Sequence, residues 1–252
     1  MGRFGVHEGA IPGGSGYSAA AMRRDDSDNL PLAPTSSLPA PASRIVAALE
    51  PLLTEQRRAR IEQVIAARSN AVVAVLDGLI DPHNISAVLR SADAFGVHEV
   101  HLIQHPEPFL ASPRISQGAD RWVSVVTHKS AQSCVNALRA RGHRIFTAAT
   151  EGTMCPADLA REPHPAIVFG NEHAGVSPEL RALSDGTYTI PMRGFVGSLN
   201  VSVAAAITLF SAMQGRSGNL GDQATQELRA RYCLLSVPEA EAIVAEHMRR
   251  HP

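Results

Sequence analysis

The sequence is short of lysine and cysteine and has no long apolar run. Lysine occurs once among the 23 basic residues, at Lys129. The three cysteines, Cys134, Cys155 and Cys233, are odd in number and far apart, which argues against a disulfide framework and a zinc knuckle. No stretch reaches the roughly 18 apolar residues of a membrane span, and no secretory signal begins the chain. We therefore expect a soluble, cytoplasmic protein outside the membrane.

The net charge of the chain is no evidence for or against a nucleic-acid partner. The formal net charge is −1 for 252 residues. The field of the whole molecule is therefore too weak to attract a polyanion, and any such partner must meet a local basic patch.

The chain divides into four segments. Residues 1–42 are rich in Gly, Ser, Pro and Ala without periodicity, which predicts a disordered leader. Residues 43–69 have loosely helical apolar spacing, which Pro51 divides into two short helices. A catalytic domain is predicted over 70–215 and a helical extension over 216–252, with helices at 223–232 and 239–250.

The central segment alternates apolar runs with helical patterns. This alternation predicts an α/β domain, in which a mostly parallel sheet is flanked by crossover helices. The predicted strands are 71–76, 99–103, 144–148, 166–169 and 188–190, and the predicted helices are 84–95, 131–141, 178–183 and 199–213.

The first candidate motif is residues 81–90, DPHNISAVLR, where a strand ends and a helix begins. Asn84 is a candidate helix cap. Arg90 follows six residues later, just under two turns, so we expect the two side chains to face roughly the same side. Alone, such a pair is explained by a cap and a solvated arginine.

The second motif is residues 169–178, FGNEHAGVSP, a glycine-rich turn between a strand and a helix. A phosphate-binding P-loop is excluded because Val176 stands where its lysine is required, and the G-x-G-x-x-G dinucleotide fingerprint is absent. Ser177 and Pro178 are typical of a helix start. The glycines around Glu172 favour a backbone surface for another adenosine-like ligand.

The third motif is residues 190–207, IPMRGFVGSLNVSVAAAI, where a strand leads through a glycine-rich loop into a helix of small residues. The G-x-S-x-G pattern of a hydrolase nucleophile is absent around Ser198. Small residues allow tight helix packing, but packing leaves Ser198 and Asn200 unexplained.

The histidines do not form a recognisable metal motif. His98, His101 and His105 lie close in sequence, but they do not match H-E-x-x-H, and on a strand their side chains point to opposite faces. We therefore expect no metal site.

Together, in this order, the three motifs resemble those of the SpoU branch of the SPOUT methyltransferases. The likeness covers about residues 70–214, and residues 84–100 look especially like the TrmH-type tRNA guanosine methyltransferases. The resemblance implies an α/β domain whose C-terminal part threads a loop to form a trefoil knot, which is an exception to ordinary topology. It also implies a homodimer in which Asn84 and Arg90 serve a cofactor held by the other chain.

The implied cofactor is S-adenosylmethionine, bent within the knot and held by backbone groups. By resemblance these groups lie near Thr147, Ala148, Gly170, Ile190 and Leu199, in loops at the carboxyl ends of strands. The implied reaction is 2′-O-methylation of a ribose in RNA.

The resemblance assigns catalytic positions as well. Arg90 would activate the ribose hydroxyl, although a guanidinium is a poor base. Asn84, Glu172, Ser198 and Asn200 would build the site, with Glu172 fixing Arg90 or a loop.

The expected RNA is tRNA, at a guanosine of the D-loop, because no sizeable folded RNA-binding domain is predicted ahead of the catalytic domain, as rRNA enzymes commonly carry. The alternatives are an rRNA 2′-O-methyltransferase and a non-catalytic knotted RNA-binding or assembly factor. The terminal helices carry arginines that could bind phosphates, while C-terminal glutamates dilute this charge. These candidates are Arg57, Arg58, Arg60, Arg68, Arg216, Arg229, Arg231, Arg249 and Arg250, of which the first three and Arg216 are preferred.

Overall fold

The computed structural model describes residues 30–31, 37–103, 110–111 and 119–251. Most of the expected leader lies outside these ranges, as does His105. Within the described ranges, every helix is too short or too polar to span a bilayer.

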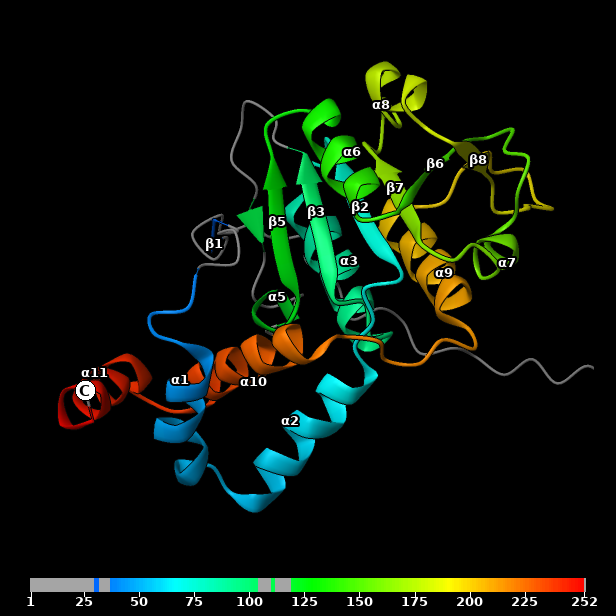
Figure 1. Ribbon diagram of the computed structural model, residues 1–252. Coiled ribbons are helices and arrows are strands. Elements are labelled where there is room, and N and C mark those ends of the chain that lie inside the picture. Colours follow the sequence, from blue (N-terminus) through cyan, green and yellow to red (C-terminus); the bar gives the residue numbers. More distant parts are fainter. Residues whose placement is uncertain (1–29, 32–36, 104–109, 112–118, 252) are drawn as a thin grey trace, which may run out of the picture.

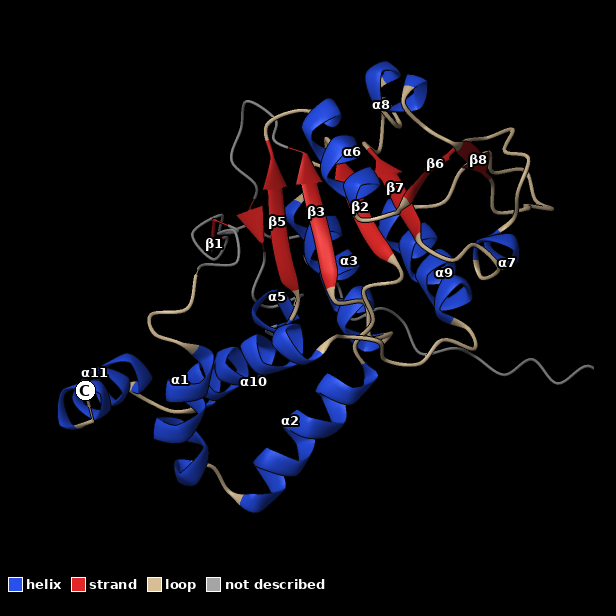
Figure 2. Cartoon of the chain, in the orientation of Figure 1, coloured by secondary structure: helices blue, strands red, loops and turns tan. Residues whose placement is uncertain are grey.

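Six parallel strands form the central sheet (Figures 1 and 2), in the order β5-β3-β2-β7-β6-β8. The expected parallel α/β architecture is confirmed. The inner strand β2 is buried at all five positions, as expected when helices cover both faces. The strands are β2 (Val73–Asp77), β3 (Glu99–Ile103), β5 (Ser124–His128), β6 (Arg144–Ala148), β7 (Pro165–Gly170) and β8 (Gly186–Tyr188).

Helices cover the two faces of the sheet as two separate apolar cores. One core lies under α3 (Pro82–Ala94) and α9 (Val201–Met213). The other lies under α6 (Ala131–Ala140) and α8 (Pro178–Ala182). Figure 1 shows α6 in front of the sheet and α3 and α9 behind it. Adjacent residues of a strand therefore face different cores.

The terminal helices form a third core below the sheet in Figure 1. The N-terminal pair is α1 (Ala42–Leu49) and α2 (Glu55–Ala67), separated by a 3-10 turn over Glu50–Leu52 that contains Pro51, as expected. The C-terminal pair is α10 (Asp222–Ser236) and α11 (Ala240–Arg250). Arg229 of α10 donates two hydrogen bonds of 2.6 Å to Glu62 of α2. The helices α1 and α2 and the helices α10 and α11 are thus parts of one helical unit.

Most predicted elements occur within three residues of their expected ends. The strands at Glu99–Ile103 and Arg144–Ala148 match residue for residue. The edge strand β5 was not predicted. Short elements were also missed, namely β1 (Leu30–Pro31), β4 (Leu110–Ala111), α5 (Ala119–Trp122) and α7 (Pro156–Leu159).

Arg68 joins the terminal helices to the sheet, and its expected role in phosphate binding is wrong. Its side chain is 1% exposed. The guanidinium forms an ion pair with Asp93 and donates to the carbonyls of Val97 and Trp122, both at 3.2 Å. Nε also donates to the Tyr232 hydroxyl at 3.1 Å. These donors are used inside the protein and cannot reach RNA.

Two buried histidines predict a dependence of stability on pH. Burial lowers the pKa of both His98 and His143 to about 4, and each ring has an Nδ1 atom without a hydrogen-bond partner among the described residues. An unfolded histidine titrates near 6.5, so between about pH 6.5 and 4 the unfolded chain binds more protons. The free energy of unfolding should therefore fall as pH falls through this window, by at most about 3 kcal/mol per histidine.

Urea unfolding at several pH values between 4 and 7.5 measures this slope. His143→Gln should flatten it, whereas His173→Gln, at an exposed position, should leave it unchanged. A slope that His143→Gln does not alter would remove this histidine from the explanation.

Candidate active site

A chain of hydrogen bonds joins one residue from each sequence motif. Asn84 on α3 is 8% exposed. Its Nδ2 donates to Oε1 of Glu172 at 2.7 Å, and its Oδ1 accepts from Nδ2 of Asn200 at 3.0 Å. Three segments far apart in sequence therefore meet at a central amide, and Asn84, Glu172 and Asn200 lie together, as the resemblance implied.

Asn84 is not the helix cap, in contrast to the expectation from sequence. Asp81 caps α3, because its Oδ1 accepts from the His83 amide at 2.9 Å, and Pro82 occupies the first turn. Asp81 and Asn84 both suit the cap position, and the sequence alone did not separate them. The amide of Asn84 is consequently available to Glu172 and Asn200.

Asn200 is itself a helix cap. Its Oδ1 accepts from the backbone amides of Ser202 at 2.9 Å and Val203 at 3.4 Å, at the start of α9. The side chain therefore fixes the beginning of α9 while its Nδ2 holds Asn84. Because Asn200 both caps α9 and holds Asn84, the hydrogen-bonded side chains of Asn84, Glu172 and Asn200 keep a fixed position relative to the loop before α9.

Asn171, which sequence reasoning missed, holds the turn after β7. Its Oδ1 accepts from the backbone amides of residues 173 and 174, and its Nδ2 donates to the Gly78 carbonyl at 2.8 Å. Nearby, Oδ2 of the buried Asp77 accepts from the Ser177 amide at 2.7 Å. The turn is thereby tied to the end of β2. The sequence did offer a sign of this role, because Asn171 stands between Gly170 and Glu172 in a tight turn, where asparagine side chains often bind the backbone.

Gly170 is required by a close backbone approach. A Cβ atom there would lie 2.2 Å from the carbonyl carbon of Gly175 and the nitrogen of Val176. Gly175 has φ of +69°, in the left-handed region that favours glycine. The two glycines therefore shape the turn that carries Glu172.

A cavity of about 280 Å³ opens beside this turn. Its wall comes from the ends of β6 and β8, the loop before α9 and the turn after β7, all at the carboxyl edge of the sheet, where α/β folds bind ligands. The lining residues are Ala148, Ala149, Thr150, Gly175, Arg181, Tyr188, Thr189, Ile190, Met192, Gly197, Ser198, Leu199 and Ala204.

Three of the five predicted cofactor residues line this cavity, namely Ala148, Ile190 and Leu199. Ser198, predicted as catalytic, also lies in the wall. Thr147 and Gly170 are not among the lining residues. Thr147 is fully buried, and its Oγ1 has no hydrogen-bond partner among the described residues.

The lining also contains residues that the sequence did not single out. Arg181 brings a positive charge to a wall that is mostly apolar, and Met192 and Tyr188 add apolar surface. Backbone groups, an apolar wall and a few polar atoms suit a bent adenosine-type ligand. The residues present therefore fit the expected cofactor.

Arg90 points away from Asn84. It is exposed and makes no hydrogen bond or ion pair with any residue that the structure describes, whereas Asn84 is buried. Six residues at about 100° each place the two side chains about 120° apart around the helix. The expectation that they face the same side is therefore wrong, and Arg90 is free to meet a partner outside this chain.

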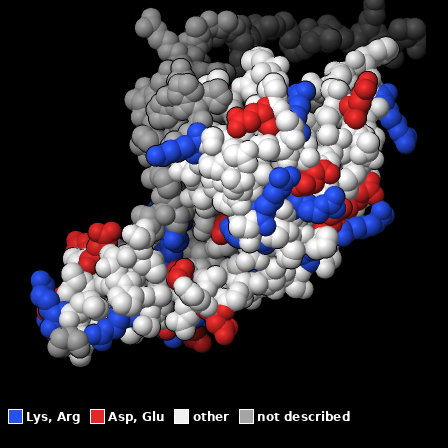
Figure 3. Space-filling view, turned by 45° about the horizontal axis from the view of Figure 1, so that its top comes forward, with Lys and Arg blue, Asp and Glu red and all other residues white. Residues whose placement is uncertain are grey.

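The arginines preferred for RNA contact have different surroundings. Arg57 lies over the Trp122 ring at 5.1 Å and, with Arg60, lines a cleft between α2 and α10. Arg58 is exposed. Arg216 instead donates to backbone carbonyls at residues 159, 160, 162, 163 and 212, which gives it a structural use. On the face shown in Figure 3, basic and acidic side chains are interspersed.

Known proteins share the chain's central segment. A profile of the SpoU rRNA Methylase family matches residues 71–210. The tRNA (guanosine(18)-2'-O)-methyltransferase of Thermus thermophilus is 39% identical over 164 residues, which are 65% of this chain and 84% of the relative. The 23S rRNA (guanosine-2'-O-)-methyltransferase RlmB of Xanthomonas campestris is 35% identical over 157 residues, 62% of this chain and 63% of the relative.

Solved structures agree with the sequence comparison. The A. aeolicus TrmH/SpoU tRNA modifying enzyme superposes with a TM-score of 0.67 at 26% identity, covering 73% of this chain and 98% of that chain. The methyltransferase AviRb from Streptomyces viridochromogenes, in complex with AdoMet, gives a TM-score of 0.53 at 30% identity, covering 60% of this chain and 63% of that one.

Proposed function

The chain belongs to the SpoU methylase family, and from this premise we propose that it transfers a methyl group from S-adenosylmethionine to a ribose 2′-hydroxyl of tRNA, at guanosine 18. The observation that carries the proposal is the Asn84–Glu172–Asn200 chain beside the cavity. It unites the three family motifs in one site. The 39% identity to a tRNA guanosine-18 enzyme supports the substrate.

S-adenosylmethionine would bind in the cavity between the loops that follow β6 and β8. Backbone groups at Ala148, Ile190 and Leu199 would hold its adenosine, and Arg181 would pair with its carboxylate. When bound, the cofactor supplies an electrophilic methyl group on sulfur. A related AviRb structure contains AdoMet, which supports this assignment.

The chain's own residues position the acceptor. Asn84, held between Glu172 and Asn200, would fix the turn after β7 against the start of α9, and Ser198 lies in the cavity wall. Arg90 binds the phosphate next to the target ribose and stabilises negative charge developing on its 2′-oxygen. Precise alignment of oxygen, methyl and sulfur is the principal source of catalysis.

The orientation of Arg90 supports a homodimer in which it completes the partner's site. The outward face of α9 carries Val203, Ile207 and Phe210, which are 47%, 39% and 53% exposed. These positions share one helical stripe. The Phe210 ring contacts Phe95 of α3, with centroids 5.5 Å apart, so the apolar face adjoins the helix of Arg90. A second copy covering this face would bring its own Arg90 across the interface.

The double change Val203→Glu/Ile207→Glu should produce a monomer without methyltransferase activity. Two buried charges would weaken the dimer by at least about a hundredfold, since a residue at the centre of an interface contributes about 2 kcal/mol or more. Light scattering after gel filtration measures the mass. Leu52→Glu is the matched control, because Leu52 is 57% exposed on another surface. A double variant that stays dimeric and active would exclude this interface.

The fold of the cofactor site supports the trefoil knot implied by the family. A Cβ atom on Gly152 would lie 2.2 to 2.6 Å from backbone atoms of Tyr188 and Thr189. The Thr189 amide also donates to the Met154 carbonyl at 2.9 Å. The loop after β6 therefore runs parallel to the end of β8, backbone against backbone, and this close packing suits a chain threaded through a loop.

The relatives' lengths favour tRNA over rRNA. The chain spans 84% of the Thermus tRNA enzyme but 63% of the Xanthomonas rRNA enzyme. Its likeness to the A. aeolicus tRNA modifying enzyme extends over 98% of that protein. Exposed Arg58 and Arg60 of α2 are proposed to contact tRNA phosphates in the cytoplasm. The second candidate is rRNA methylation, supported by the 35% identity to RlmB.

The deciding experiment is methylation of total RNA from cells lacking the enzyme, with labelled cofactor, followed by nuclease mapping. We expect label at guanosine 18 of tRNA. Label confined to rRNA would establish the second candidate. Absence of both label and S-adenosylhomocysteine binding in calorimetry would instead identify a non-catalytic RNA-binding protein.

A further inference from the structure

Two histidines and a cysteine from three different elements meet on the sheet face covered by α6. They are His101 of β3, His128 at the end of β5 and Cys134 of α6. His101 Nδ1 lies 2.8 Å from His128 Nε2. One ligand atom from each residue lies within 4.8 Å of the other two. His101 is 2% exposed and Cys134 is fully buried.

This cluster is separate from the candidate active site. His101 lies two residues before Ile103, so the two side chains share a strand face, and Ile103 belongs to the core that contains Cys134. Val100 and Leu102 belong to the opposite core, under α3 and α9. The sheet therefore stands between the cluster and α3, which carries Asn84.

The donor set is typical of zinc. Two imidazole nitrogens and a thiolate are preferred zinc ligands, at about 2.0–2.1 Å for nitrogen and 2.3 Å for sulfur. In a tetrahedral site these bonds place the two nitrogens about 3.3 Å apart. In the structure the His101 and His128 nitrogens are 2.8 Å apart and the ring planes differ by 9°, so the nitrogens face each other as in a hydrogen bond. Binding an ion requires both rings to turn toward Cys134 and the nitrogens to separate by about 0.5 Å.

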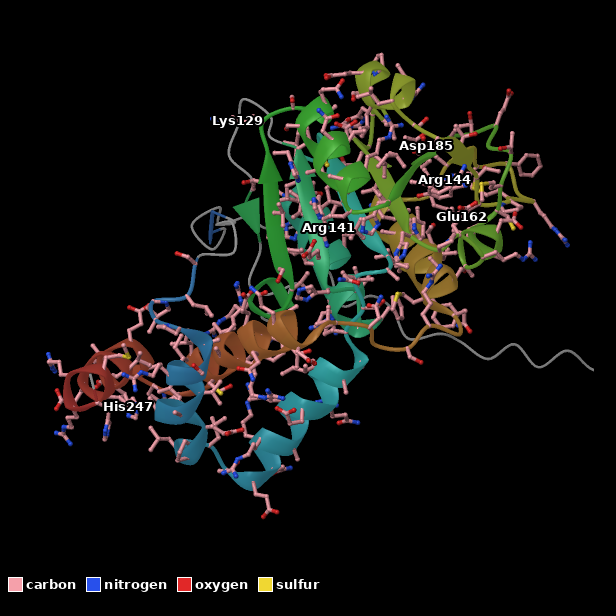
Figure 4. All side chains as sticks on the ribbon, viewed as in Figure 1. Lys129, Arg141, Arg144, Glu162, Asp185 and His247 are labelled. Atoms are coloured by element: carbon pink, nitrogen blue, oxygen red, sulfur yellow. The ribbon has the colours of Figure 1, made fainter. Side chains whose placement is uncertain are left out.

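A carboxylate orients the buried histidine. Glu99 Oε2 lies 3.2 Å from His101 Nε2, and Arg141 donates to the same oxygen at 2.5 Å. Figure 4 labels Arg141 beside β3. When its Nε2–H donates to Glu99, His101 presents its Nδ1 lone pair to a metal, as in carboxylate–histidine–zinc arrangements.

We propose that His101, His128 and Cys134 bind a zinc ion, with water as the fourth ligand and Glu99 orienting His101. A bound dication supplies the positive charge that a thiolate at the buried Cys134 requires. The ion would crosslink the edge strand β5 to β3 and α6 and so stabilise the fold.

The proposal departs from the sequence-based expectation of no metal. That expectation considered His98, His101 and His105, which are close in sequence. His128 and Cys134 follow His101 at distances of 27 and 33 residues, and only the parallel pairing of β3 with β5 brings them together.

The test uses the full-length protein, freed of metal by dialysis against a chelator. Zinc is titrated in competition with a chromophoric chelator, and cobalt(II) serves as a spectroscopic probe. We expect one equivalent of either metal, with a thiolate-to-cobalt charge-transfer band. Cys134→Ser should abolish the band and weaken zinc binding by at least about a hundredfold.

Matched variants separate coordination from folding. Cys233→Ser removes another buried thiol, in the core of the terminal helices, and should retain the band and the affinity. Glu99→Gln should retain the band but bind zinc about tenfold more weakly. Circular dichroism of each metal-free variant verifies folding.

Two outcomes would overturn the proposal. One is wild-type protein that binds no stoichiometric zinc. The other is a Cys134→Ser variant with wild-type affinity and an unchanged cobalt spectrum. Either result would make the cluster a hydrogen-bonded histidine pair beside an inert thiol.

Discussion

Replacing Arg90 with alanine should lower the rate of methyl transfer by about 10²–10³-fold, the range typical of losing a donor that stabilises negative charge developing in a transition state. The side chain is exposed and unpaired among the described residues, so its removal breaks no bond within the chain. S-adenosylhomocysteine binding should stay unchanged because Arg90 does not line the cavity. Single-turnover methylation of tRNA transcript, together with calorimetry, measures the two quantities.

Two further variants make this result specific. Arg90→Lys keeps the charge but loses the planar fork that suits phosphate, and should recover only part of the rate. Arg161→Ala, which removes an exposed arginine paired with Asp158, should have no effect. Wild-type turnover by Arg90→Ala would transfer the catalytic role to another residue.

Replacing Arg68 with methionine should cost about 2–4 kcal/mol of unfolding free energy, because it leaves buried hydrogen-bond acceptors without their donor, at about 1–3 kcal/mol each. The ion-pair partner Asp93 is 34% exposed, so water partly compensates its charge. The substitution preserves most of the volume but leaves Asp93 without its partner. It also leaves the carbonyls of Val97 and Trp122 without their donor. Urea unfolding at neutral pH measures the loss.

The control for Arg68 is Arg249→Met, because Arg249 forms an exposed ion pair with Glu246 and contributes little. We expect a change below about 0.5 kcal/mol for this control. An equally small change for Arg68→Met would show that the terminal helices do not depend on this arginine.

Periodicity was sufficient for the central fold because each inner strand is buried on both faces. The apolar runs at β3 and β6 therefore stood out from the helical patterns around them. The edge strand β5 is as long as β3 and β6, but it was missed because only Val125 of its five residues is buried, which weakens the apolar signal. The order of strands in the sheet was beyond reach, since it depends on contacts between distant segments.

The sequence predicted which residues belong to the candidate site better than it predicted how their side chains are arranged. The motifs around Asn84, Glu172 and Asn200 do meet. The role of Asn84 was misassigned, because Asp81 three residues earlier satisfies the same capping requirement. The direction of Arg90 follows from helix geometry and was misjudged.

Features that depend on distant partners were not foreseen. Arg68 finds Tyr232 at a separation of 164 residues, so nothing near it in sequence marked it as buried. In the sequence, Arg68 could not be distinguished from the exposed Arg58 and Arg60 of the same arginine-rich segment.

The shared core of the terminal helices has a consequence for synthesis on the ribosome. The apolar side chains of α1, among them Ile45 and Leu49, are covered only when α10 arrives. Because the ribosome makes α1 early and α10 late, these apolar side chains of α1 remain exposed to solvent while the strands of the sheet are being translated. Aggregation during that interval, rather than instability of the finished protein, is then the step at which a chaperone has most to protect.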